Sequence, residues 1–253
     1  MKSSSLINPR QSRGFTLVEI LVTITIILIL AALTVIGTKR LRESADMVTS
    51  TKRIGGLVQA NALFAADNGG KYVEAYAFDE ESKPKVPWHY NRTFLETLIG
   101  DSLNIENAVE FEGVDGLPDQ VLDPAVVRAK KKDWSRISAS YAYNNENVPG
   151  GGWGQPGTSR AHTITSVQNP TESFAFITAT DWIANYGGRY LWKRRPVEGK
   201  TNDSKIAYRH RDKAIAAFYD GHVETLSMKD MQKIDRNYGI DNVFWGGTKR
   251  GGK

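Results

Sequence analysis

The stretch Arg13–Gly37, "RGFTLVEILVTITIILILAALTVIG", decides how the chain begins to fold. After its first residue it carries a single charge, Glu19, and Ile20 to Thr38 then supplies 19 residues without any charge. As a helix with a rise of 1.5 Å per residue these residues extend about 28 Å, close to the ~30 Å hydrocarbon core of a bilayer. The segment can therefore cross a membrane once, and Glu19 is a costly residue to place in it.

This apolar run is compatible with three ordinary roles: a cleaved secretory signal, a plain membrane anchor and a buried core helix. A secretory signal has a shorter apolar region before a small-residue cleavage site, and only Ala31-Ala32 offers a poor site here. A core helix is rarely apolar on every face. A plain anchor fits the length, yet it explains neither Glu19 nor the basic residues ahead of Gly14. From the run alone, a plain membrane anchor is the simplest of the three interpretations.

Positive charge lies on both sides of the run, so the positive-inside rule does not settle its orientation. Arg10 and Arg13 precede it, and Lys39, Arg40 and Arg42 follow it.

The helical pattern continues beyond the apolar run. Apolar residues recur near a 3.6-residue period up to Ala65, and Asn68-Gly69-Gly70 supplies a stop. The sequence thus predicts a helix from about Phe15 to Asp67. Two adjacent glycines, Gly55 and Gly56, each cost about 1 kcal/mol relative to alanine in a helix, so they make a bend or break plausible there.

The rest of the chain predicts strands, loops and short helices. The segment 92–100 is helical in pattern, 139–145 and 173–182 read as strands, and 213–227 reads as a hairpin joined by Asp220-Gly221, a dipeptide suited to a two-residue type I′ turn. We therefore expect an α+β fold in which the long N-terminal helix packs on an antiparallel sheet.

Composition narrows the possible chemistry. The net charge of +5 comes largely from the two ends of the chain, and the basic run 128–136 has no accompanying nucleic-acid motif, so we expect no nucleic-acid partner. The chain has no cysteine, which excludes a disulfide framework, a thiolate nucleophile and a Cys-ligated zinc site. The glycine-rich loop 148–157 lacks the lysine of a phosphate-binding loop. Its Trp153 and the other five tryptophans could serve as contact residues, although core packing is the simpler role for most of them.

Only three residues form a cluster of metal-ligand type: His210, Asp220 and His222. The simpler interpretation is that Asp220 caps its own turn and His210 forms a hydrogen bond nearby, on an adjacent strand, so we expect no metal or other cofactor. No serine-hydrolase motif accompanies His89 or His162, and we expect no enzymatic activity.

The N-terminal motif "RGFTLVEILV" closely resembles the signal of type IV prepilins and type II secretion pseudopilins: a basic leader ending in glycine, followed by Phe-Thr-Leu-Val-Glu and an apolar helix. The resemblance implies that a prepilin peptidase cuts between Gly14 and Phe15 on the cytoplasmic side and methylates the new amine. The leader is then inside and the body outside the inner membrane. It also implies a partner for Glu19, because the cationic amine of Phe15 in a neighbouring subunit can pair with it when the helices bundle.

A second resemblance covers residues 139–226. His210, nine intervening residues and then Asp220-Gly221 are similar to the H-x9-DG pattern of large pilin-like families of the planctomycete and verrucomicrobial kind. The segments "ASYAYNNEN" and "SVQNPTESFAFITATDW" are similar to parts of the same proteins. Some members carry a cysteine-proline element before the first of these segments, where this chain has Asp123-Pro124.

These resemblances imply a subunit, major or minor, of a type IV pilus or a type II secretion pseudopilus. The expected organisation is a cytoplasmic leader (1–14), a transmembrane and assembly helix (15–38), a continuation of that helix (39–68) and a periplasmic pilin-like domain (69–253). The implied partners are prepilin peptidase, other pilin or pseudopilin subunits, the inner-membrane assembly platform and the lipid bilayer. A membrane-anchored periplasmic binding or sensing module is the competing hypothesis, and a metal-dependent enzyme is a third.

Overall fold

The computed structural model describes residues 15–77, 87–100, 121–129, 140–146, 159–188, 205–235 and 242–247. The chain divides into two compact units, residues 1–42 and residues 43–253. The leader, the glycine-rich loop and most of the basic run 128–136 lie outside the described residues, as do three of the six tryptophans. The second unit, residues 43–253, is here called the head. Of the three described tryptophans, Trp88 and Trp245 are fully buried in it.

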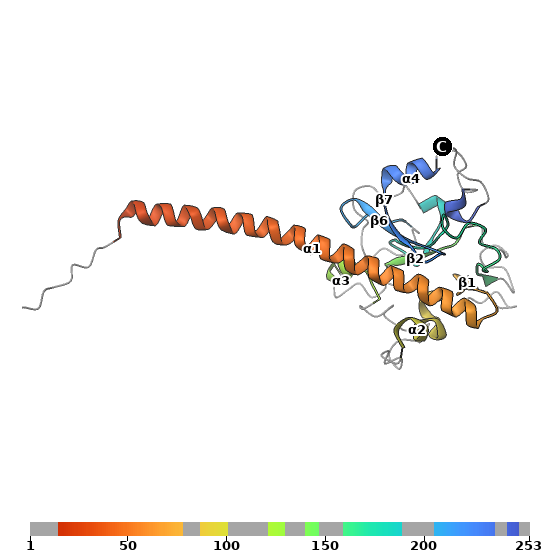
Figure 1. Ribbon diagram of the computed structural model, residues 1–253. Helices are drawn as coiled ribbons and strands as arrows, with labels where there is room; N and C mark the ends of the chain where they lie inside the picture. Colours follow the sequence, from red (N-terminus) through yellow and green to blue (C-terminus); the bar gives the residue numbers. More distant parts are fainter. Residues whose placement is uncertain are drawn as a thin grey trace, which may run out of the picture. The chain divides into compact units, whose positions relative to one another are not determined.

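The long helix α1 spans Leu17–Asp67 (Figure 1). It ends where the sequence predicts, because Gly69 and Gly70 adopt left-handed φ angles of 63° and 82° and the Gly70 amide donates to the Ala65 carbonyl at 2.8 Å. The helix is uninterrupted at Gly55 and Gly56, so the break that these two glycines suggested is absent. In the head, residues 43–67 of α1 supply one wall of the hydrophobic core.

Gly55 and Gly56 lie close to side chains from other parts of the head. A Cβ atom on Gly55 would lie 3.5 Å from Cγ2 of Val223, and one on Gly56 would lie 3.8 Å from Cδ1 of Leu98. Both distances are ordinary van der Waals contacts. The close approach leaves room for a methyl group but for little more.

We expect Gly56→Ala to stabilise the head by about 0.5 to 1 kcal/mol, because alanine removes the entropic cost of glycine and its methyl group meets Leu98 without a clash. Chemical denaturation followed by circular dichroism measures the effect. Gly56→Leu is the contrasting variant, since its larger side chain must displace Leu98. A destabilised Gly56→Ala would contradict the packing.

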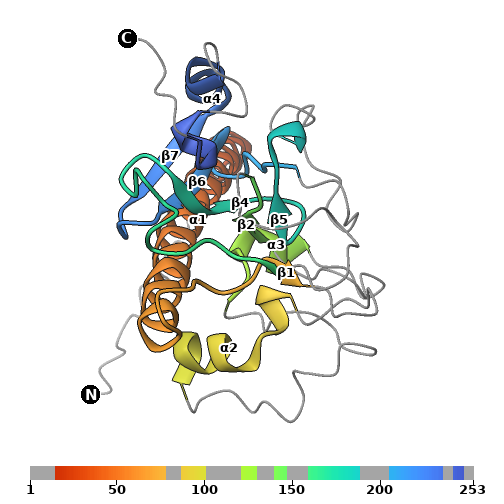
Figure 2. The ribbon, with the colours of Figure 1, turned by 90° about the vertical axis from the view of Figure 1, so that its right-hand side faces the viewer.

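The head contains a five-stranded sheet in the order β5-β2-β4-β6-β7, seen beside α1 in Figure 2. Its strands are β2 (Tyr141–Asn144), β4 (Phe174–Thr178), β5 (Ile183–Ala184), β6 (Lys213–Phe218) and β7 (Val223–Ser227). Three of the four pairings are antiparallel, as predicted. The pairing of β2 with β5 is parallel, so the sheet is mixed rather than purely antiparallel. The α+β architecture is confirmed.

Shorter elements surround this sheet. They are β1 (Tyr76–Ala77), which pairs with β3 (Ser159–Arg160), the helices α2 (Arg92–Ile99), α3 (Pro124–Ala129) and α4 (Met228–Asp235), and the 3-10 turns η1 (Trp88–Tyr90), η4 (Tyr186–Gly188) and η6 (Val243–Trp245).

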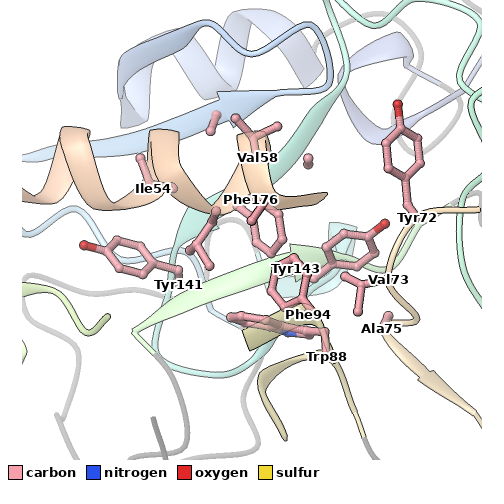
Figure 3. Close-up of a cluster of buried hydrophobic side chains, with 14 of the residues drawn as sticks. Ile54, Val58, Tyr72, Val73, Ala75, Trp88, Phe94, Tyr141, Tyr143 and Phe176 are labelled. Carbon is pink, nitrogen blue, oxygen red and sulfur yellow. The ribbon is translucent and has the colours of Figure 1, made fainter. Parts of the chain in front are cut away.

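The sheet is buried on both faces. On one face Ile54 and Val58 of α1 approach Tyr143 and Phe176, and Trp88 and Phe94 close the cluster (Figure 3). The opposite face is covered by α4 and η6. The side chains of β6 divide between the two clusters in strict alternation: Ile215 and Ala217 join the first, and Ala214, Ala216 and Phe218 join the second. The strand β6 is apolar because both of its faces are buried.

The β6–β7 hairpin differs from the predicted two-residue turn. Phe218 donates its amide to the His222 carbonyl at 2.9 Å, so the loop has three residues, Tyr219 to Gly221, and only Gly221 has a positive φ, 98°. The neighbouring turn at Pro170 and Ser173 accepts hydrogen bonds from the Asp220 and Tyr219 amides, which fixes the longer loop. Thus Tyr219 does not pair with His222.

A turn with the predicted dihedral pattern occurs instead at Arg211-Asp212, where φ is 52° and 59°. His210 and Lys213 exchange both backbone hydrogen bonds across it, at 3.2 and 3.1 Å. Two consecutive residues with positive φ mark a type I′ turn. The sequence signal for this turn is weak, because arginine rarely adopts that conformation.

His89 gives the head a pH-dependent stability. It is 2% exposed beside Trp88 and Trp182, its Nδ1 has no hydrogen-bond partner among the described residues, and burial lowers its pKa from 6.5 to about 3. Below pH 6.5 the unfolded chain therefore binds a proton at His89 that the folded chain does not bind. The stability that comes from keeping His89 neutral is fully present above pH 6.5 and is lost as the pH falls toward 3.

We expect the free energy of unfolding to decrease by about 2 kcal/mol between pH 7 and pH 5 through His89 alone. His89→Phe removes the titrating group while keeping a ring of similar size. Denaturation of both proteins at several pH values isolates the contribution of His89 as a difference. Equal slopes for the two proteins would contradict a neutral buried imidazole.

Candidate functional site: the N-terminal segment and its buried anchor

The N-terminus of α1 is closed by Thr16 and Glu19. Thr16 donates its amide and its hydroxyl to Oε2 of Glu19, at 2.8 and 2.9 Å, and the Glu19 amide donates to the Thr16 hydroxyl at 3.2 Å. With Leu17 as the first helical residue, this is a capping box, in which an N-cap threonine and a glutamate three residues later satisfy each other's backbone amides. The carboxylate thus has a hydrogen-bond partner within its own first helical turn.

Sequence reasoning singled out Glu19 and overlooked Thr16. The signal was available, since Thr-x-x-Glu ahead of an apolar run is the sequence signature of a capping box. Phe15 directly precedes the cap and is 82% exposed. Gly14, on the other side of the expected cleavage site, lies outside the described residues.

In the described part of the chain, the apolar side chains that follow the cap are exposed. Leu17, Leu28 and Val35 are 83%, 67% and 69% exposed, and the other large apolar side chains described in this part of α1 are also solvent-facing. In the described part of the chain, α1 is the one helix that is long and apolar enough to cross a membrane. So large an exposed apolar surface requires a bilayer or other helices around it.

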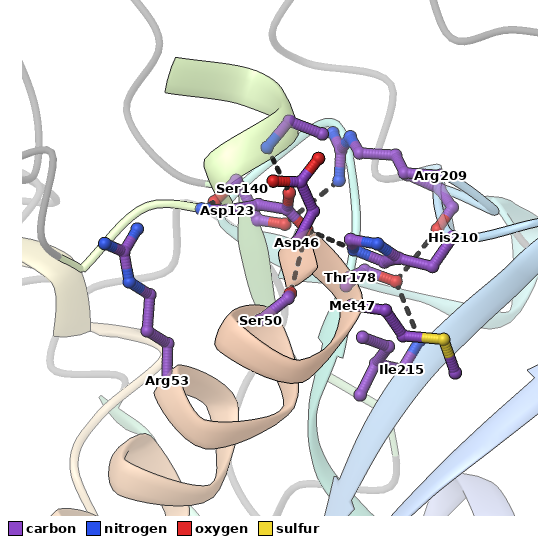
Figure 4. A network of polar contacts seen from close by, with 12 residues as sticks. Asp46, Met47, Ser50, Arg53, Asp123, Ser140, Thr178, Arg209, His210 and Ile215 are labelled. Carbon is purple, nitrogen blue, oxygen red and sulfur yellow. Dashed lines mark hydrogen bonds and ion pairs between the residues drawn. The ribbon is translucent and has the colours of Figure 1, made fainter. Parts of the chain in front are cut away.

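A second polar site lies within the head, where the carboxylate of Asp123 is fully buried (Figure 4). Oδ2 accepts hydrogen bonds from Oγ of Ser50 at 2.9 Å and from Nε2 of His210 at 2.7 Å, and Oδ1 accepts from the Ala125 amide at 2.8 Å. The three donors belong to α1, to the segment before β6 and to α3. One carboxylate therefore joins three parts of the chain that are far apart in sequence.

Electrostatics keep Asp123 ionised. Burial alone would raise its pKa, but the hydrogen bond from His210 and the nearby charge of Arg209 outweigh burial, and the pKa lies below its ordinary value of 3.8. Arg209 is itself held by the Ala179 carbonyl at 2.7 Å and the Ser140 carbonyl at 3.3 Å. A buried charge with this many hydrogen bonds is stable only while its partners remain in place.

Further contacts attach the same region to α1. Arg128 of α3 forms a two-pronged ion pair with Asp46, with Nη1 to Oδ1 at 2.7 Å, and Arg53 donates to the Leu122 carbonyl. Arg128, the first residue of the basic run, thus faces an acid of its own chain. Ser50 also lies 2.9 Å from the Tyr141 hydroxyl of β2.

The structure separates the three candidate metal ligands. His210 precedes β6 and contacts Asp123, whereas Asp220 and His222 follow β6 at the other end of that strand. Six residues of strand extend about 20 Å, so the three side chains cannot converge on one ion. The predicted hydrogen bond of His210 exists, but its partner is Asp123 rather than a residue on an adjacent strand.

At the hairpin, Oδ1 of Asp220 accepts a hydrogen bond from the His222 amide at 3.2 Å, as the turn-capping interpretation predicts. The same oxygen lies 2.5 Å from Nδ1 of His222. Nε2 of His222 lies 3.5 Å from Glu224. The imidazole stacks on Phe218, with ring centroids 4.3 Å apart. Among the described residues, no group of three or more His, Asp or Glu side chains is arranged to hold a metal ion.

Comparison with known proteins bears on the N-terminal segment. No curated protein and no solved structure matches the chain. Residues 9–35 match the family model described as the prokaryotic N-terminal methylation motif, a range that includes Gly14, Phe15, Thr16 and Glu19. The chain therefore carries the N-terminal methylation motif of prepilin-like precursors.

Proposed function

We propose that the protein is a structural subunit, major or minor, of a type IV pilus or a type II secretion pseudopilus. The observation that carries this proposal is the methylation motif at residues 9–35 merging into a capped helix whose apolar side chains are exposed. Cleavage after Gly14 and methylation of Phe15 by a prepilin peptidase mature the subunit.

The proposed organisation follows from this maturation. Residues 1–14 are the cytoplasmic leader, residues 15–38 span the inner membrane and later form the filament core, residues 39–68 continue the helix, and residues 69–253 form a periplasmic domain. The partners are other pilin or pseudopilin subunits and the assembly platform of the inner membrane. Within the head, the contacts of Asp123 and Arg128 support this arrangement, since they hold residues 46–50 of α1 against the rest of the domain.

The proposed chemistry of assembly is the exchange of one partner of Glu19 for another. In the precursor the carboxylate accepts hydrogen bonds from Thr16. Cleavage creates a cation at Phe15, and in a filament the Glu19 carboxylate of one subunit meets the Phe15 amine of the next. An ion pair is far less costly in an apolar surround than either charge alone.

Mass spectrometry of the protein isolated from membranes tests the maturation. We expect chains that begin at N-methyl-Phe15. An intact Met1, or a cut near Ala31-Ala32, would contradict the proposal. Coexpression with a catalytically inactive prepilin peptidase is the control, and it should leave the leader attached.

A further inference from the structure

We propose that Lys39, Arg40 and Arg42, here called the basic collar, bind the phosphate groups of anionic lipids at the membrane surface where the apolar run ends. The inference rests on the proposed function, because it takes residues 15–38 to span the inner membrane. It adds a binding partner, the anionic lipid headgroup, and a reason for three cations on the periplasmic side.

The position of the basic collar along α1 matches the headgroup layer. Lys39 follows Thr38, the last residue of the uncharged run, and Arg42 lies roughly 6 Å beyond Thr38 at the helical rise. The headgroup layer on each side of a bilayer is roughly 5 to 7 Å thick. All three cations therefore fall within it when Thr38 is at its inner boundary.

The three side chains are exposed and lie within somewhat less than half of the helix circumference. Successive helical residues are about 100° apart, so positions 39, 40 and 42 cover roughly 160° of the circumference. Cations distributed in this way can meet several lipids at once.

The orientation of the span places the basic collar on the side of the membrane that is electrostatically unfavourable for cations, and anionic lipids reduce this cost. Lysine and arginine near the ends of a span favour the cytoplasmic side, yet the proposed topology, with the leader in the cytoplasm, places these three on the opposite side. The only acid among residues 37–45 is Glu43. Phosphate groups of anionic lipids supply further negative charge near these cations.

The test measures lipid selectivity of the full-length chain in liposomes of phosphatidylglycerol and phosphatidylcholine. Spin-labelled lipids of each type report, by electron paramagnetic resonance, how strongly the protein immobilises them. We expect wild type to prefer phosphatidylglycerol about fivefold more than the variant Lys39→Gln/Arg40→Gln/Arg42→Gln does, and expect 1 M salt to remove most of the difference. The control Lys213→Gln/Lys229→Gln/Lys233→Gln removes three exposed charges from the head and should behave as wild type.

Equal selectivity of wild type and the collar variant would overturn the proposal, as would an equal loss in the control. A collar variant that keeps its lipid selectivity but fails to enter filaments would show that the basic collar binds protein instead, which also overturns it. Protein that does not enter the liposomes at all, as shown by alkaline carbonate extraction, would overturn the transmembrane span and with it the proposed function. Inserted protein without selectivity overturns only the lipid contact.

Discussion

Glu19→Gln is expected to leave the protein inserted and processed but to reduce its incorporation into filaments at least tenfold. Glutamine can replace glutamate in a capping box, so the start of α1 is preserved. The variant lacks only the negative charge that, in the proposed filament, faces the Phe15 amine of a neighbouring subunit. Removing one partner of a buried ion pair costs about 3 to 5 kcal/mol, which exceeds a hundredfold in an association equilibrium.

The measurement compares the fraction of subunits in sheared filaments with the fraction that remains in the membrane. Glu19→Ala should show the same loss of incorporation, since it also lacks the charge. Thr16→Ala is the matched variant for the cap, because it removes the hydroxyl that bonds Oε2 of Glu19 and leaves the charge intact. A cap is worth about 1 kcal/mol, so its defect should be smaller. Normal incorporation of Glu19→Gln would refute the pairing of Glu19 with Phe15.

Asp123→Ala is expected to destabilise the head by about 3 to 5 kcal/mol. The variant removes the acceptor of Ser50 and His210 and leaves Arg209 without the buried charge that compensates it. Because Ser50 belongs to α1, the loss should also loosen residues 46–50 of that helix. Denaturation gives the free energy, and amide hydrogen exchange of α1 locates the loosening.

The pH dependence of the free energy of unfolding tests whether the charge of Asp123 is the cause of this destabilisation. Its pKa is lower in the folded protein than the ordinary 3.8, so its ionised form stabilises the fold above that value and the stabilisation is lost as the pH falls through the folded-state pKa. The difference between wild type and Asp123→Asn should therefore be constant near neutral pH and shrink in acid. Asp67→Ala, at an exposed position, should change the stability by no more than about 0.5 kcal/mol. An Asp123→Asn protein as stable as wild type at pH 7 would contradict this role.

Much of the secondary structure could be predicted locally. The end of α1 at Asn68-Gly69-Gly70, the short helix α2 and the strands β2, β4, β6 and β7 all lie within the predicted segments. Each has a signal within a few residues: an apolar period of 3.6 or 2, or a glycine that tolerates positive φ. Such signals depend on neighbours in the chain, so they are readable without tertiary structure.

Predictions that depended on distant residues were less successful. The hairpin loop has three residues rather than two because the Pro170–Ser173 turn accepts its amides. The β2–β5 pairing is parallel, and no local pattern in two-residue β5 specifies a direction. Judged by residue type, His210 belongs with Asp220 and His222 as a possible metal ligand. In the fold, however, the partner of His210 is Asp123, 87 positions earlier.

By itself the sequence determined the N-terminal motif, the length of the apolar run and the α+β character of the chain, because each follows from residues that are contiguous or periodic. Only the tertiary structure decided that Asp123 is the buried anchor of the head, since a carboxylate becomes costly to leave unpaired only when folding removes water from it. The contact of Glu19 with Thr16 is different, because it lies within one helical turn and its Thr-x-x-Glu signature is readable in the sequence.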